Sequence, residues 1–188
     1  LRDDIHNIQS GFDIVNCGSS YTPIHQIQGS GVDIALTGTQ TTEGVVTFLA
    51  PDMGGFFMQS LDGQWDADDA TSEGLFVYDS TLAGSLSIGD HVRLTGTASD
   101  YTSGSFGQFV KMSELSSITS STICATGLSA TPATVNLPIP GDPDTYLERY
   151  EGMLVIIPQT LTVQQNYFQG RFGQLTLGSG GRIFTQEN

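Results

Sequence analysis

The chain of 188 residues carries 6 Lys and Arg against 20 Asp and Glu, a formal net charge of −14, which argues against tight nonspecific binding of DNA through clustered cations. A hydrophobic content of 38%, a charged content of 14% and 23 Gly disfavour a helical protein and favour strands and turns. No apolar run reaches the roughly 18 residues of a membrane-spanning helix, so we expect no membrane partner.

The first segment, residues 1–35, shows no sustained helical or strand periodicity. We interpret it as an N-terminal arm and linker, held to the rest of the chain by Ile24 and Ile27 because it has no core of its own. His25 lies between these two residues, and we expect it to pack or hydrogen-bond within the arm.

Four short segments with strand character follow at near-regular spacing, each bounded by Gly or Asp, and a fifth follows a turn. His91 alternates with Val92 and Leu94 in one of them, which predicts a surface position on a strand. Five strands at this spacing predict an all-β fold, an OB-fold-like five-stranded barrel over residues 36–119. The segments are 41–47, 55–59, 74–78, 88–96 and 108–110, the last preceded by a turn at 101–106.

The remaining residues, 120–188, predict a β-rich C-terminal extension packed on the barrel. It begins with a connector rich in Ser, Thr and Pro that runs through Cys124, and its prolines exclude a central strand because Pro lacks the N–H that a ladder needs. Residues 153–157 form a fully apolar run typical of a strand buried on both faces. Residues 174–177 and 182–185, joined by Gly and Ser, predict a hairpin.

The two cysteines, Cys17 and Cys124, both lie in turn-like stretches rich in Gly or Thr. Two alternatives are open, a pair of free thiols or one disulfide. The even count and the lack of a thiol-chemistry motif favour the disulfide. It would tie the N-terminal arm to the far side of the barrel.

A loop of twelve residues, 62–73, contains five acidic side chains. Their mutual repulsion needs either a cation or open water, and flexible oxygen-rich loops bind Ca²⁺. The spacing resembles that of an EF-hand loop, although Ala67 replaces the required Gly. Two interpretations stay open, a solvated acidic loop and a Ca²⁺ site with four carboxylate ligands, Asp62, Asp66, Asp68 and Glu73.

A second candidate site is the exposed face of the barrel. OB folds bind single strands by stacking bases on aromatic side chains of the middle strands. Phe57, Phe76 and Tyr78 are the candidates for stacking, and Arg93 and Lys111 are the candidates for phosphate contacts. The alternative is that the aromatic side chains belong to the core, because alternation turns one of each adjacent pair inward.

A catalytic set is not expected. His6, His25 and His91 lie in unrelated contexts, without the spacing of a two-histidine metal site, and no nucleophile-elbow serine is present. A metal-dependent phosphodiesterase needs carboxylates and histidines that converge on a phosphate. We therefore expect no enzyme activity from this chain alone.

Three blocks, together with the strand order, carry a resemblance to a known family: Thr22–Gly31, Leu147–Met153 and Asn166–Gly173. In this order they resemble the OB-fold region of secreted bacterial nucleases, which precedes a catalytic domain of the endonuclease/exonuclease/phosphatase type. The resemblance covers about residues 17–188. It implies a noncatalytic part of an extracellular or cell-surface nuclease that degrades DNA or RNA.

In that family the domain's partner would be its own catalytic nuclease domain, which it would position while guiding a polynucleotide. Because of the charge of −14, we expect only weak binding of single-stranded DNA or RNA. We also expect the chain to be a piece of a longer protein. The alternative is a Ca²⁺-stabilised structural or interaction module of a secreted or surface protein, with no role in nucleic-acid binding.

Overall fold

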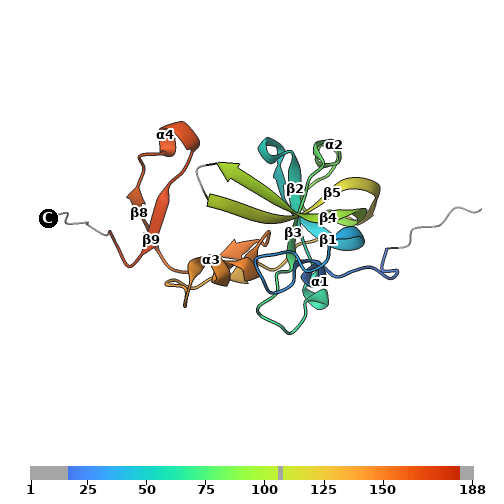
Figure 1. Cartoon of the computed structure of the whole chain (residues 1–188), viewed down its shortest axis with the longest axis horizontal. Helices are drawn as coiled ribbons and strands as arrows, with labels where there is room; N and C mark the ends of the chain where they lie inside the picture. The colour runs from blue at the N-terminus through green and yellow to red at the C-terminus, as the bar shows by residue number, and fades with distance from the viewer. Residues whose placement is uncertain (1–16, 106–107, 183–188) are drawn as a thin grey trace, which may run out of the picture.

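The computed structural model describes residues 17–105 and 108–182, and its centre is a closed β-barrel (Figure 1). The five strands of the barrel are β1 (Gly38–Ala50), β2 (Gly55–Gln59), β3 (Gly74–Val77), β4 (His91–Ser105) and β5 (Gln108–Ala125). Short helices lie between them or before them: α1 (Ile24–Gln28), η1 (Pro51–Met53), η2 (Asp62–Gln64) and α2 (Ser80–Ala83).

The strands follow one another around the barrel in the order β1-β2-β3-β5-β4, and β4 pairs with β1 to close it. The β3–β5 pair is parallel, with Phe76 opposite Glu114, and the other pairs are antiparallel. A closed five-stranded barrel with this order is the OB architecture. The prediction of an all-β, OB-like barrel is confirmed.

The β4–β5 hairpin is much longer than the sequence suggested. Residues 101–105, predicted to form a turn, continue the ladder, with Tyr101 opposite Met112. Residues 120–125, predicted to begin a connector, belong to β5, and Ile123 pairs with Val92. The reason is that residues 111–125 are rich in Thr, Ser and Ile and contain no Pro, so the ladder continues to Ala125.

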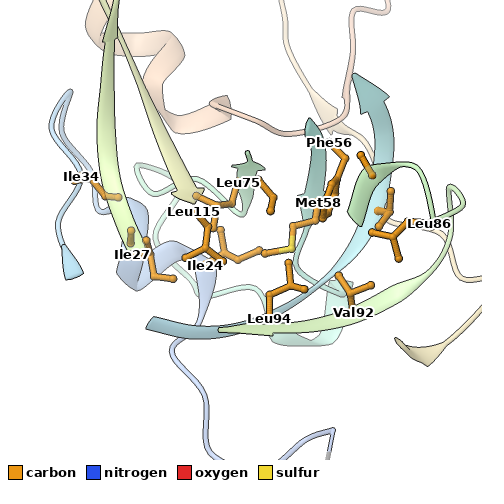
Figure 2. Close-up of a cluster of buried hydrophobic side chains, with 14 residues drawn as sticks. Ile24, Ile27, Ile34, Phe56, Met58, Leu75, Leu86, Val92, Leu94 and Leu115 are labelled. Carbon is orange, nitrogen blue, oxygen red and sulfur yellow. The ribbon is translucent and has the colours of Figure 1, made fainter. Parts of the chain in front are cut away.

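The core of the barrel is filled by apolar side chains from all five strands, and α1 covers one end of it (Figure 2). Ile24 and Ile27 on α1 are fully buried, which confirms that they anchor the N-terminal arm. The fully buried strand residues include Phe56, Met58, Leu75, Leu94 and Leu115.

The arm also covers the outer side of β1 and β4, which corrects the prediction for His91. This side chain is buried, with Nε2 3.7 Å from Oε2 of Glu43. The backbone N–H of Gly18 donates to Oε1 of Glu43, and the N–H of Thr22 donates to the carbonyl of Thr41. His91 is therefore buried beside Glu43, a residue that the arm also binds, on the side of the strand that alternation turns away from the core.

Cys17 and Cys124 form a disulfide, with 5.7 Å between their Cα atoms and a sequence separation of 107. Cys124 lies near the end of β5, so the bond ties the arm to the barrel. The predicted disulfide is confirmed. Closing so long a loop lowers the conformational entropy of the unfolded chain, which stabilises the folded state by roughly 4 to 5 kcal/mol in the chain-entropy description.

The C-terminal region contains two small sheets. Leu154–Ile156 are exposed, so the prediction of a doubly buried strand at 153–157 is wrong. The predicted hairpin of 174–177 with 182–185 is also not formed by the described residues, because β9 pairs with β8 instead; residues 183–185 lie outside them. The elements are β6 (Ala133–Thr134), α3 (Pro143–Tyr146), η3 (Leu147–Tyr150), β7 (Val155–Ile156), β8 (Leu161–Gln165), α4 (Gln169–Phe172) and β9 (Thr176–Ser179).

The extension contacts the barrel through residues 128–154, beginning with the N–H of Leu128, which donates to the carbonyl of Gly89. The side-chain amide of Gln59 on β2 binds the backbone of the extension through both polar atoms: Nε2 donates to the carbonyl of Thr131, and Oε1 accepts from the N–H of Leu154. Figure 1 shows β8, α4 and β9 at the end of the molecule away from the barrel. None of the helices in the described ranges has the length and apolar character for crossing a bilayer.

Candidate functional site

A cleft of about 510 Å³ opens on the barrel surface between three elements: η1 in the β1–β2 connection, β3, and the β4–β5 hairpin. In OB folds, the face of strands 2 and 3 together with the β1–β2 and β4–β5 loops binds the ligand. The cleft therefore lies where this architecture places its ligands. It is lined by Asp52, Met53, Phe76, Tyr78, Tyr101, Met112 and Glu114.

Two tyrosines supply the exposed aromatic surface of the cleft. Tyr78, directly after β3, is 55% exposed, and Tyr101 on β4 is 52% exposed. Gly54 permits the position of Tyr78, because a Cβ at this residue would lie 2.9 Å from Cε2 of the ring. Gly54 also has a φ of 74°, which an L side chain rarely adopts.

The other two predicted stacking residues lie deeper. Phe76 is buried, and its ring centroid lies 4.9 Å from that of Phe57. Phe57 is half-buried and lies 6.4 Å from the exposed ring of Phe48. Of the three predicted residues, Tyr78 alone offers a largely free ring face, whereas Phe76 supports the cleft from below and Phe57 joins Phe76 to Phe48.

Sequence reasoning missed Tyr101 and Met112, which face each other across the β4–β5 ladder and both line the cleft. The signal was present, since Met112 and Glu114 alternate with Lys111 and Ser113 as in a strand. It was overlooked because residues 101–106 were interpreted as a turn.

The two predicted phosphate contacts are not in the cleft. Arg93 is buried: Nη1 donates to Oε1 of Glu43 at 2.6 Å and to the carbonyl of Ser19, and Nη2 donates to the carbonyl of Ser20. Lys111 binds the carboxylate of Asp33 and alternates with Met112, so it faces away from the cleft. Neither side chain is placed to meet a phosphate bound against Tyr78.

The charged groups that do line the cleft are acidic, Asp52 and Glu114. Burial raises the pKa of Glu114 above its ordinary value. The cleft thus combines stacking surface with carboxylates, a combination that suits flat or hydroxyl-rich groups better than phosphates.

The four predicted Ca²⁺ ligands do not converge on one point, and three of them accept hydrogen bonds from different neighbours. Asp62 accepts hydrogen bonds from Oγ1 of Thr131 at 2.5 Å and from its N–H at 3.0 Å, which hold the pKa of Asp62 below its usual value. Asp68 accepts from the N–H of Ala70. Asp66 accepts from the N–H of Asp68 and, through both oxygens, from Oγ1 of Thr71.

Two of the four ligands, Asp66 and Glu73, lie together with a third residue from the arm. Nδ1 of His25 lies 3.0 Å from Oε1 of Glu73, and Nε2 lies 3.9 Å from Oδ2 of Asp66. The prediction that His25 hydrogen-bonds is confirmed, although its partner lies outside the arm. The sequence offered no signal for this contact, because His25 precedes Glu73 by 48 residues.

Comparison with known proteins adds little to this geometry. No family model matches the chain, and no curated protein matches it. Among solved structures, a small single-stranded DNA-binding protein from Streptomyces coelicolor is similar at a TM-score of 0.31 and 14% identity, over 45% of this chain and 92% of that chain. The assignment of the fold therefore rests on the strand topology itself.

Proposed function

We propose that this chain is a noncatalytic, OB-type binding module of a secreted nuclease, and that its cleft binds single-stranded polynucleotide weakly. The observation that carries the proposal is the placement of Tyr78 and Tyr101 in a cleft between η1, β3 and the β4–β5 hairpin. OB folds bind extended polymers at this position. The Cys17–Cys124 disulfide is compatible with an oxidising, extracellular environment.

Stacking supplies the affinity in this proposal. A base stacked on an aromatic side chain contributes roughly 1 to 3 kcal/mol, and Tyr78 and Tyr101 offer two such surfaces. Asp52 and Glu114 repel the phosphates, as does the net charge of −14. We therefore expect dissociation constants in the high micromolar to millimolar range for short oligonucleotides.

Salt dependence gives this mode of binding a distinctive signature. Proteins that neutralise phosphates with Lys and Arg lose affinity steeply as the salt concentration rises. Here the nearby charges are acidic, so added salt screens repulsion. We expect the affinity to stay constant or to increase between about 0.05 and 0.3 M salt.

The catalytic step would belong to a separate domain of the same protein, with this module holding that domain and the incoming strand in register. A weak, sequence-tolerant contact suits such a role, because a substrate that is degraded must also move on. Two exposed aromatic faces without a cation would retain a strand briefly and release it.

The test is an NMR titration of the ¹⁵N-labelled chain with an oligothymidylate of about ten nucleotides, since NMR measures millimolar affinities. We expect shifts confined to the residues around the cleft. The double substitution Tyr78→Ala with Tyr101→Ala should weaken binding at least tenfold. Tyr167→Ala is the matched control, because Tyr167 is 78% exposed and lies between β8 and α4, outside the cleft.

Two outcomes would contradict the proposal. One is equal affinity of the double variant and the wild-type chain. The other is binding of a neutral oligosaccharide at the cleft with no shifts from the oligonucleotide, since OB folds also bind sugars and Asp52 and Glu114 are able to accept hydrogen bonds from hydroxyl groups.

A further inference from the structure

We propose that His25, Asp66 and Glu73 form a site for a divalent transition-metal ion of the Zn²⁺ type, which joins the N-terminal arm to the acidic loop. Each residue offers one ligand atom, and the three atoms lie within 4.8 Å of one another. This site is separate from the cleft, and its ligand set differs from the Ca²⁺ set of four carboxylates.

Three separate parts of the chain bring the ligands together. His25 lies on α1, Asp66 lies in the loop after η2, and Glu73 directly precedes β3. α1 is fixed against the barrel core by Ile24 and Ile27, which flank the histidine. Two of the three ligands are therefore held by buried elements, and the loop residue completes the group.

The environment of Glu73 points to a ligand. This residue is only 4% exposed, and its Oε1 is shared between Nδ1 of His25 and the N–H of Asp66. Its second oxygen, Oε2, is buried and has no hydrogen-bond partner among the described residues. A buried carboxylate oxygen without a partner is costly, and a bound cation would satisfy it.

The ligand group opens into a cavity of about 400 Å³, which Asp66 and Glu73 line together with the exposed residues Asp68 and Asp69. The carboxylates at its rim attract cations from solution. Arg149 also lines this cavity, but its guanidinium carbon lies 4.1 Å from the ring centroid of Tyr146, and its Nε donates to the carbonyl of Tyr146. The arginine therefore binds Tyr146 in the cavity wall and, within the described part of the chain, forms no ion pair with the ligand group.

Coordination chemistry decides between classes of metal. Ca²⁺ takes six to eight oxygen ligands, whereas imidazole with carboxylates suits Zn²⁺ and related ions at about 2.0 to 2.2 Å. Binding would replace the hydrogen bond between His25 and Glu73, because the metal takes the place of the proton. The side chains of His25 and Asp66 are 12% and 29% exposed, which leaves an entry path from solvent.

The test uses the tag-free chain, stripped with EDTA and titrated separately with Zn²⁺, Co²⁺ and Ca²⁺. We expect one equivalent of Zn²⁺ to raise the melting temperature by roughly 5 °C, because the metal binds the native state preferentially. Co²⁺ should produce a visible absorption band from nitrogen and oxygen coordination. Ca²⁺ at the same concentration should shift the melting temperature far less.

Substitutions assign the ligands. His25→Asn, Asp66→Asn and Glu73→Gln keep a hydrogen-bonding group at each position but should each weaken Zn²⁺ binding at least tenfold. Asp66→Asn is the substitution least expected to disturb folding, because the side chain of Asp66 is the most exposed of the three. The matched controls are Asp62→Asn and Asp68→Asn, which remove the same charge from the same loop outside the group and should weaken Zn²⁺ binding far less than the three ligand substitutions do.

Three results would overturn the proposal. They are the absence of a Co²⁺ absorption band, an equal Zn²⁺ response in Asp66→Asn and the wild-type chain, and loss of the response in the two control variants. The last result would return the loop to a Ca²⁺-type carboxylate site. None of these measurements depends on the cleft, so they are independent of polynucleotide binding.

Discussion

The two ends of the described chain use similar apolar side chains in opposite ways. At the N-terminal end, an arm without periodicity is held by the Cys17–Cys124 disulfide and by two fully buried isoleucines on α1. At the C-terminal end, the apolar residues of β7, β8 and β9 are largely exposed, including Ile156 at 52% and Leu177 at 49%. The comparison teaches that burial here depends on access to the barrel, and hydrophobicity alone does not secure it.

The sheets explain the difference. In the barrel, every strand has two paired neighbours, and β4 and β5 share a long antiparallel ladder. β8 and β9 form a two-stranded sheet of their own. An isolated hairpin of two strands is marginally stable in water, so we expect the C-terminal hairpin to contribute little to global stability.

The sharpest test of this comparison is a Leu→Ala substitution made once in the barrel core and once in the C-terminal hairpin. Leu94→Ala in the barrel core should reduce the free energy of unfolding by about 2 to 5 kcal/mol, because the side chain is fully buried. Leu177→Ala on β9 should change it by less than about 0.5 kcal/mol. Urea titrations followed by circular dichroism measure both, and equal losses would show that the hairpin belongs to the same cooperative core.

Between these extremes lies the segment around Gly152, which docks on the barrel beside Gly74. A Cβ on Gly74 would lie 2.2 Å from the carbonyl carbon of Gly152, so the two backbones approach as closely as glycine allows. The hydroxyl of Ser72 donates to the carbonyl of Glu151 and holds the segment in place. The extension is thus attached to the barrel at a point that accepts no side chain.

We expect Gly74→Ala to displace this segment and to cost about 1 to 3 kcal/mol, as overpacking does elsewhere. Gly63→Ala is the matched control, because nothing lies within 4 Å of a Cβ at Gly63. Limited trypsin digestion at Arg149 reports the displacement, which should speed cleavage in the first variant alone. Unchanged protection of Arg149 in Gly74→Ala would mean that the barrel edge adjusts and the docking survives.

Strand patterns and local propensity predicted the barrel, because its strands are bounded by glycine and carry β-branched and aromatic residues. They failed at Tyr101, where Ser and Gly nearby suggested a turn, yet pairing across the hairpin continues the strand to Ser105. They failed again at 153–157, because an apolar run indicates a tendency to be buried but does not supply the partner that buries it.

The candidate sites were less predictable than the fold, because they depend on contacts across long sequence separations. The sequence indicated an aromatic face and an acidic loop, and both features lie at cavities. The sequence predicts Arg93 to be available for a phosphate. In the structure it forms a buried ion pair with Glu43, 50 residues earlier. Similarly, His25 reaches Glu73 only through the docking of α1.

The last test of the comparison concerns Glu151, which joins the extension to the barrel. Its Oε1 accepts the N–H of Ser113 on β5 at 2.8 Å. Burial, reinforced by the nearby carboxylates of Glu148 and Asp100, raises the pKa of Glu151 from 4.5 to about 7, although the hydrogen bonds from Ser113 act in the opposite direction. The protonated form is therefore the one that the docked segment prefers.

The sign of the pH dependence follows from this raised pKa. Between about pH 4.5 and pH 7 the folded chain holds more protons at Glu151 than the unfolded chain, so its contribution to stability is fully present below pH 4.5 and is lost as the pH rises to 7. Because the carboxyl is partly solvated, we expect this loss to be about 1 to 2 kcal/mol.

Glu151→Gln should remove this pH dependence and make the chain more stable than wild type at pH 8. The control Asp52→Asn, at an exposed carboxylate of η1, should do neither. Urea titrations from pH 4 to pH 8 measure the difference, and parallel pH profiles for wild type and Glu151→Gln would show that this contact is already open in solution.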